Sequence, residues 1–146
     1  KFPHRFIECG IAENNAAAIA AGLAKTGKTL FLCSFACFSP AINWAVIRQS
    51  ICYNNLNVKI VGSHAGLMTA DLGATHQILE DVALMSALPN MEVFAPVDAY
   101  ETEKITTVLA RSRRPAYLRL VRPNTPIITN PKTPFIRFGL TFLRYL

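Results

Sequence analysis

The chain has 146 residues, of which 51% are hydrophobic and 16% charged, a composition that excludes a disordered protein and allows one buried core. Its formal net charge is +6, but the basic residues are dispersed, and no basic stripe interleaved with aromatic residues indicates a nucleic-acid partner. No apolar run approaches the roughly 20 residues of a membrane span, so no membrane partner is expected either.

The amino-terminal residues and the cysteines both indicate an intracellular setting. KFPHRF is not followed by the apolar core of a signal peptide, which predicts a cytoplasmic protein. The cysteines lie in apolar surroundings without the close pairing that zinc sites use, so we expect reduced, buried thiols and no metal site. They are Cys9, Cys33, Cys37 and Cys52.

Short apolar runs alternate with helical patterns along the chain. Strands are predicted over residues 5–10 and 29–35, from residue 58 into a glycine-rich loop, and over residues 92–97 and 115–121. Helices are predicted over residues 13–26, 40–53, 76–88 and 99–113, the second beginning at Ser39-Pro40 and the last at a capping box of Asp98 and Glu101. The strands are continuous apolar runs, as in sheets covered on both sides. The pattern predicts an α/β fold, a mainly parallel sheet with helices on both faces.

The first predicted helix has almost no polar face. Glu13, Asn14 and Asn15 stand at its entry, and small apolar residues follow up to Lys25. A surface helix ordinarily has a polar stripe, so we expect this helix to be buried all round. A carboxylate in the first turn also interacts favourably with the helix dipole, which is the ordinary structural explanation for Glu13.

Unusual residues follow several of the predicted strands. Ligands of open parallel sheets bind beyond the carboxyl ends of the strands, so these residues are expected at one edge. Each also has a purely structural explanation: an aromatic residue in the core, a histidine bonded to the backbone, a helix cap or a surface charge. Their convergence favours a binding site. They are Glu13, Asn14, Asn15, Phe35, Phe38, His64, Asp71, Thr75, His76, Gln77, Arg122 and Pro123.

Several spaced motifs, in the same order, resemble the transketolase family of thiamine-diphosphate enzymes. GIAENNAAAIAAGLAKTGK resembles the family's GIAEQN-type segment, CSFACF its Thr-Phe-Ala-x-Phe strand end, and RLVRPNTPII its Arg-Pro segment. The stretch from VKIVGSHAGLMTADLGATHQ to VDAYETEK is similar to the centre of the family's pyrimidine domain. The resemblance covers roughly residues 2–128 and is nearest to the carboxyl-terminal subunit of split transketolases.

This resemblance implies a thiamine-diphosphate-binding fold and a place for the cofactor. Residues 1–128 are expected to form the pyrimidine-binding domain, lacking its first strand, and residues 129–146 a linker or the start of a truncated carboxyl-terminal domain. Glu13 would hydrogen-bond the aminopyrimidine ring and activate it, aided by the desolvation of its carboxyl group. Phe35 and Phe38 would line the pocket of that ring.

The resemblance also implies substrate-binding residues and an activity. His64 and His76 would face the substrate carbonyl and hydroxyl groups as positioning and proton-transfer residues, and Arg122 would bind the sugar phosphate. The implied reaction is transfer of a two-carbon ketol unit between sugar phosphates.

The family's diphosphate- and metal-binding motif is absent from the sequence. The resemblance therefore implies an amino-terminal partner subunit, which would hold the diphosphate with Mg or Ca, and a homodimer formed through the alanine-rich helix. The chain alone is expected to be inactive. Leu72 stands where the family commonly has an aspartate that contacts a sugar hydroxyl, which puts the usual ketose specificity in doubt. Two alternatives stay open: a non-catalytic interaction subunit of the same fold, and the β subunit of a 2-oxoacid dehydrogenase.

Overall fold

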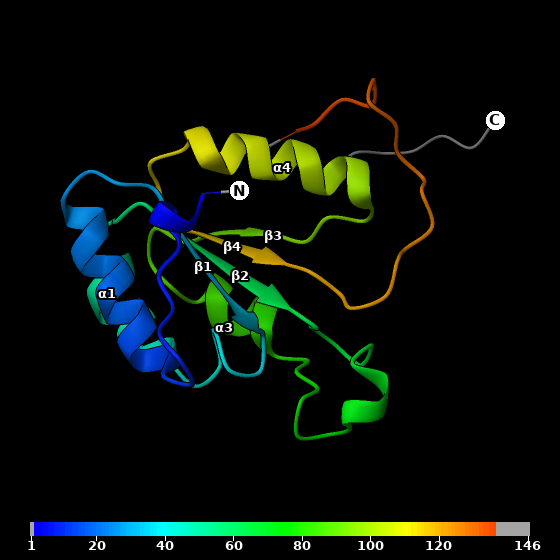
Figure 1. Cartoon of the computed structure of the whole chain (residues 1–146). Helices are drawn as coiled ribbons and strands as arrows, with labels where there is room; N and C mark the ends of the chain where they lie inside the picture. Colours follow the sequence, from blue (N-terminus) through cyan, green and yellow to red (C-terminus); the bar gives the residue numbers. More distant parts are fainter. Residues whose placement is uncertain (1, 137–146) are drawn as a thin grey trace.

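The computed structural model describes residues 2–136 and shows a sheet whose strand pairs are all parallel (Figure 1). The strands are β1 (Leu30–Phe35), β2 (Val58–Ser63), β3 (Glu92–Phe94) and β4 (Ala116–Arg119), in the order β1-β2-β4-β3. Since parallel strands share their direction, the carboxyl ends of the strands meet at one edge of the sheet. The predicted α/β fold is confirmed.

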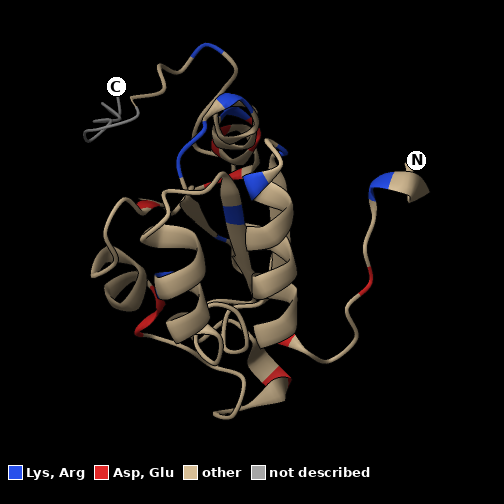
Figure 2. Ribbon diagram, turned by 90° about the vertical axis from the view of Figure 1, so that its left-hand side faces the viewer, with Lys and Arg blue, Asp and Glu red and all other residues tan. Residues whose placement is uncertain are grey.

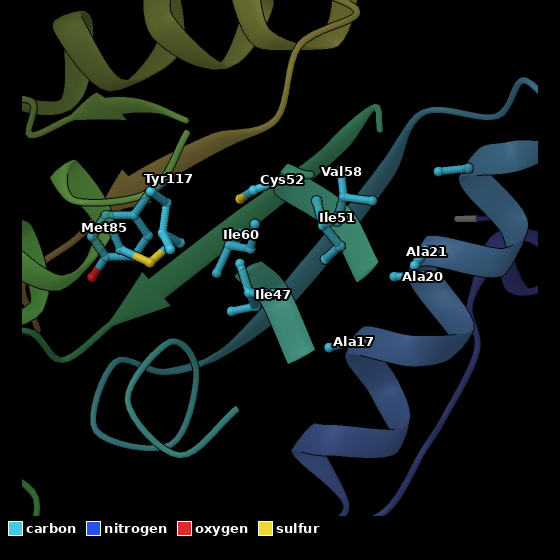
Figure 3. Packing of buried hydrophobic residues seen from close by; sticks show 12 residues of the cluster. Ala17, Ala20, Ala21, Ile47, Ile51, Cys52, Val58, Ile60, Met85 and Tyr117 are labelled. Atoms are coloured by element: carbon cyan, nitrogen blue, oxygen red, sulfur yellow. The ribbon is translucent and has the colours of Figure 1, made fainter. Parts of the chain in front are cut away.

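Helices cover both faces of the sheet (Figure 1). One face carries α1 (Glu13–Lys25), α2 (Trp44–Val46) with the π-helical turn η2 (Ile47–Cys52), and α3 (Asp81–Ser86); the other carries α4 (Ala99–Arg111). The larger core joins Ala17 of α1, Ile47 of η2, Ile60 of β2 and Tyr117 of β4 (Figure 3). The smaller core lies under α4, around Leu109 and Leu118.

The α4 helix begins as its sequence predicts. An Asp98 carboxylate oxygen accepts from the Glu101 backbone N–H at 3.0 Å, and the Glu101 side chain accepts from the Val97 N–H at 2.8 Å. The first bond confirms the predicted cap, while the second reaches one residue further back than a capping box does.

The prediction of a strand over residues 5–10 is wrong. A 3-10 turn, η1 (Pro3–Arg5), is followed by an irregular segment that stands away from the sheet (Figure 2). Phe6 is 71% exposed and Ile11 98% exposed. An apolar run forms a strand only where a neighbouring strand pairs with it, and no described residue pairs with this one.

Two predicted helices begin later than expected. Residues 36–43 form turns around a cis Ser39-Pro40 bond, and α2 begins only at Trp44. The α3 helix begins at Asp81 rather than near residue 76, because an antiparallel bridge between Gly66 and Ile78 holds the preceding chain extended. Tertiary pairing therefore overrides the local helical pattern.

The α1 helix is not buried all round. Its buried residues, Ala17, Ala20, Ala21 and Ala24, form one stripe, while Asn14, Asn15, Ala18 and Gly22 are exposed. Figure 2 shows no charged residue between the two ends of this helix. The expectation of buried thiols is likewise correct only for Cys52, since Cys33 is exposed and the other two are half-buried. All four cysteines are free.

Among residues 2–136, no helix combines the length and apolar character that crossing a membrane requires. The cytoplasmic location and the domain boundaries at residues 128 and 129 stay predictions, and much of the segment 129–146 lies outside the described residues.

Candidate functional site

Four of the predicted site residues form one aromatic cluster beyond the ends of β1 and β2. The ring of Phe35, the last residue of β1, stacks on His64 with centroids 3.9 Å apart, and lies nearly parallel to Phe38 at 6.2 Å and 9°. Phe38 in turn meets the edge of His76 at 5.4 Å. All four are partly exposed, so flat ring surfaces at this edge remain accessible to a ligand.

His64 has an unusual backbone conformation. Its φ of +56° lies in the left-handed region, which non-glycine residues rarely adopt and which is frequent at functional sites. Its Nδ1 lies 3.1 Å from the Ser63 hydroxyl oxygen, and Nδ1 of His76 lies 2.9 Å from that of Thr75. The Nε2 atom of each histidine is therefore left for another partner.

Glu13 lies beside this cluster as the first residue of α1. Its backbone carbonyl accepts a 3.1 Å hydrogen bond from the buried Asn43 side chain, which also donates to the Ser39 hydroxyl at 3.1 Å. These bonds fix the start of α1 against the turn that contains Phe38. Burial raises the pKa of the Cys37 thiol in the same turn, and the Glu13 charge adds to the rise. The Glu13 carboxylate thus acts on the turn between the two phenylalanines.

A loop over residues 66–78 forms the other side of the site. Its base is closed by the Gly66–Ile78 bridge, in which the Gly66 N–H donates to the Ile78 carbonyl at 2.8 Å. Arg122 donates from Nη1 to the Thr69 carbonyl at 2.9 Å and to a carboxylate oxygen of Asp71. The structure therefore brings Arg122 to the loop that carries His76. Leu72 is exposed on this loop.

A buried ionic network under this loop was missed by sequence reasoning. Asp81 is fully buried, and one of its oxygens accepts from the Arg119 Nε at 2.9 Å and from the Tyr117 hydroxyl at 2.7 Å. Burial and the adjacent Asp81 raise the pKa of Tyr117, which keeps the hydroxyl protonated as a donor. A Cβ on Gly66 would lie 2.9 Å from an Arg119 Nη atom, so the guanidinium supports the loop base.

A cavity of about 300 Å³ lies beside the outer edge of β1, between that strand, α1 and the segment 5–10. Of the predicted site residues it contacts only Glu13. The cavity therefore marks the space left beside the unpaired strand edge and is distinct from the aromatic cluster. Within the described part of the chain, no group of three or more His, Cys, Asp or Glu residues could hold a metal ion.

The fold and the cluster together define an α/β domain whose ligand site lies at the carboxyl edge of a parallel sheet. The family described as transketolase, pyrimidine binding domain, matches residues 1–127. The chain belongs to this family.

Known relatives agree with this assignment. The chain is 46% identical over 128 residues to a putative transketolase C-terminal section of Methanocaldococcus jannaschii, and this match covers 88% of the chain and 40% of the relative. It is 40% identical to one of the subunits of the apulose-4-phosphate transketolase of Phocaeicola vulgatus, covering 86% and 40%. The chain thus spans about 40% of the length of these relatives.

Solved structures show the same fold. A split-gene transketolase, described as an inactive beta4 tetramer, superposes with a TM-score of 0.82 at 46% identity, covering 92% of this chain and 43% of that one. The transketolase of Campylobacter jejuni superposes with a TM-score of 0.80 at 25% identity, covering 88% and 20%. The predicted resemblance to transketolases, and the predicted fold, are confirmed.

Proposed function

We propose that this chain is the pyrimidine-binding part of a split transketolase-type enzyme, which transfers a two-carbon ketol unit between sugar phosphates with thiamine diphosphate. The observation that carries the proposal is the convergence of Glu13, Phe35, Phe38, His64 and His76 at one sheet edge. Relatives named as transketolase subunits support ketol transfer over the 2-oxoacid dehydrogenase alternative.

The residues present suit the aminopyrimidine part of the cofactor. The nearly parallel rings of Phe35 and Phe38 offer faces for a flat heteroaromatic ring, and Glu13 offers one carboxyl group for a ring nitrogen. Thiamine diphosphate, when bound, supplies the carbanion chemistry of ketol transfer. In this proposal, Glu13 and the two phenylalanines orient the cofactor ring and keep water from its faces.

The histidines and Arg122 would act on the substrate. Because Ser63 and Thr75 engage their Nδ1 atoms, His64 and His76 would use Nε2 to position substrate oxygens and to exchange protons with them. Arg122 would bind the phosphate group of the sugar, for which its planar donor fork is suited.

The assembly in this proposal contains two kinds of partner. An amino-terminal subunit would supply the diphosphate site and its Mg or Ca ion, because the chain carries neither that motif nor, among its described residues, a metal cluster. A second copy would pack on the exposed face of α1. A Cβ on Gly22 would meet no atom within 4 Å, so no contact inside the chain explains that glycine.

Calorimetry tests the shared cofactor site. Thiamine diphosphate with magnesium is titrated into the chain alone and into the chain mixed with the amino-terminal subunit from the same source. Binding is expected only in the mixture, and Glu13→Ala should reduce ketol transfer by about 100-fold or more. Glu8→Ala is the matched control, because the exposed Glu8 side chain only accepts from the Gly10 N–H. A mixture that assembles without taking up cofactor would instead support a non-catalytic interaction subunit.

Size-exclusion chromatography with light scattering tests the α1 interface. Gly22→Leu should prevent association of two copies, because it adds a bulky side chain to a face that a neighbouring helix must approach closely. Thr106→Leu on the exposed side of α4 is the control, and it should leave the assembly intact. Unchanged assembly of the Gly22 variant would exclude this face.

A further inference from the structure

Arg122 already has an anionic partner within the chain. Its Nη1 atom donates both to the Thr69 carbonyl and to the Asp71 carboxylate, two groups of the loop 66–78. The Arg122 side chain is 42% exposed and that of Asp71 is 76% exposed. The ion pair therefore lies at the surface, where a ligand in solution can reach it.

The guanidinium also keeps capacity for an external anion. Within residues 2–136 only Nη1 has hydrogen-bond partners, so the N–H groups of Nε and Nη2 are open. A phosphate oxyanion could bind on that side or could replace the carboxylate. In either case the Asp71 charge opposes the bound anion, since like charges that share one cation repel each other.

The loop allows Asp71 to leave without loss of the fold. The Gly66–Ile78 bridge and the buried Asp81–Arg119 pair hold the base, whereas Asp71 lies in a 3-10 turn, η3 (Ala70–Leu72), near the exposed apex. An exposed ion pair contributes little to stability, while a phosphate dianion forms strong charge-assisted bonds to arginine. The Arg122 hydrogen bond and charge lower the pKa of Asp71, so the carboxylate is ionised at neutral pH.

We propose that Asp71 is an internal competitor for Arg122, which the phosphate group of a substrate must displace or outweigh, so that anion binding at Arg122 releases the apex of the loop. This inference rests on the proposed function, because it takes Arg122 to be the phosphate-binding residue. By linkage, anything that neutralises Asp71 raises the affinity of Arg122 for oxyanions, and an oxyanion at Arg122 weakens the hold of Asp71 to the same extent.

The test uses sulfate, a dianion that does not titrate near neutral pH, and follows backbone amide signals of the loop by NMR in the whole chain. Asp71→Asn keeps the shape of the side chain and removes its charge, and should lower the sulfate Kd by about fivefold. Glu80→Gln removes an exposed charge whose carboxylate accepts only from the Leu79 N–H, so its effect should stay below about twofold. Inorganic phosphate is then titrated to establish that the site accepts a phosphate group.

Arg122→Gln separates this inference from the proposed function. If it leaves sulfate binding unchanged, Arg122 is not an anion site, and both the competitor role and the phosphate role fall. If Arg122→Gln abolishes binding while Asp71→Asn binds sulfate no better than the unaltered chain, the phosphate role stands and the competitor role is refuted. Absence of binding to both the unaltered chain and Asp71→Asn also refutes the inference, whereas binding gained only by Asp71→Asn supports it.

Discussion

Asp81 allows the sharpest stability prediction, because a single buried carboxylate oxygen accepts hydrogen bonds from both Arg119 and Tyr117. Asp81→Ala removes that acceptor and leaves the buried Tyr117 hydroxyl unpaired. Breaking a buried ion pair by removing one partner costs about 3–5 kcal/mol. Because the Arg119 side chain is 24% exposed and can turn toward water, we expect the lower end, about 3 kcal/mol.

Two further variants separate charge from hydrogen bonding. Asp81→Asn keeps one oxygen acceptor and loses the charge, so it should reduce the free energy of unfolding by about 1–2 kcal/mol. Tyr117→Phe leaves the Asp81–Arg119 pair intact and should cost about 1 kcal/mol. The order Ala, Asn, Phe from most to least destabilising is therefore expected.

Urea denaturation of the chain measures these differences. With a slope of about 2 kcal/mol per molar urea, Asp81→Ala should lower the midpoint by about 1.5 M without changing the slope. The reasoning is refuted if Asp81→Ala costs less than about 1 kcal/mol, or no more than Asp81→Asn, since the buried pair would then carry no stabilisation.

Three other predictions concern single features of the fold. Burial alone would raise the pKa of Asp98, but its hydrogen bonds lower it well below the ordinary value; its stabilisation is therefore present above the unfolded pKa of about 4 and lost as the pH falls below it, which acid unfolding of Asp98→Asn beside the unaltered chain will show. Gly62→Ala would place a Cβ 2.5 Å from the Tyr117 hydroxyl and should cost about 1–3 kcal/mol in urea, whereas no effect would mean that the ring can move freely. Iodoacetamide should modify the exposed Cys33 in the folded chain and spare Cys52, which is fully buried and whose pKa burial raises to about 12; mass spectrometry of the peptides checks this, and modification of Cys52 at the rate of Cys33 would contradict it.

Local patterns predict the α/β class because they need no distant partner. The apolar runs that became β1 to β4, the small residues of α1 and the Asp98 cap each follow from the residues themselves. The same patterns failed at residues 5–10 and 76–80, where the state of the backbone depends on a neighbour. The run at 5–10 has no pairing strand among the described residues, and the Gly66–Ile78 bridge replaces the first helical turns.

The sequence also predicts which residues gather at the carboxyl edge, since the alternation of strands and helices implies that the strands run in one direction. It does not predict what those side chains do to one another. The stacking of His64 on Phe35 and the pairing of Arg122 with Asp71 depend on loop conformations that only the packed chain defines.

The sequence by itself therefore determined the family, the fold class and the set of candidate residues, because motif spacing and hydrophobic runs are properties of the chain. Only the tertiary structure decided that Asp81 lies under the site and that Asp71 occupies its cation. Arg119 is a charged residue in an otherwise apolar strand, and that was the sole sequence signal for the buried network. Its partner lies 38 residues away and is fixed by folding alone.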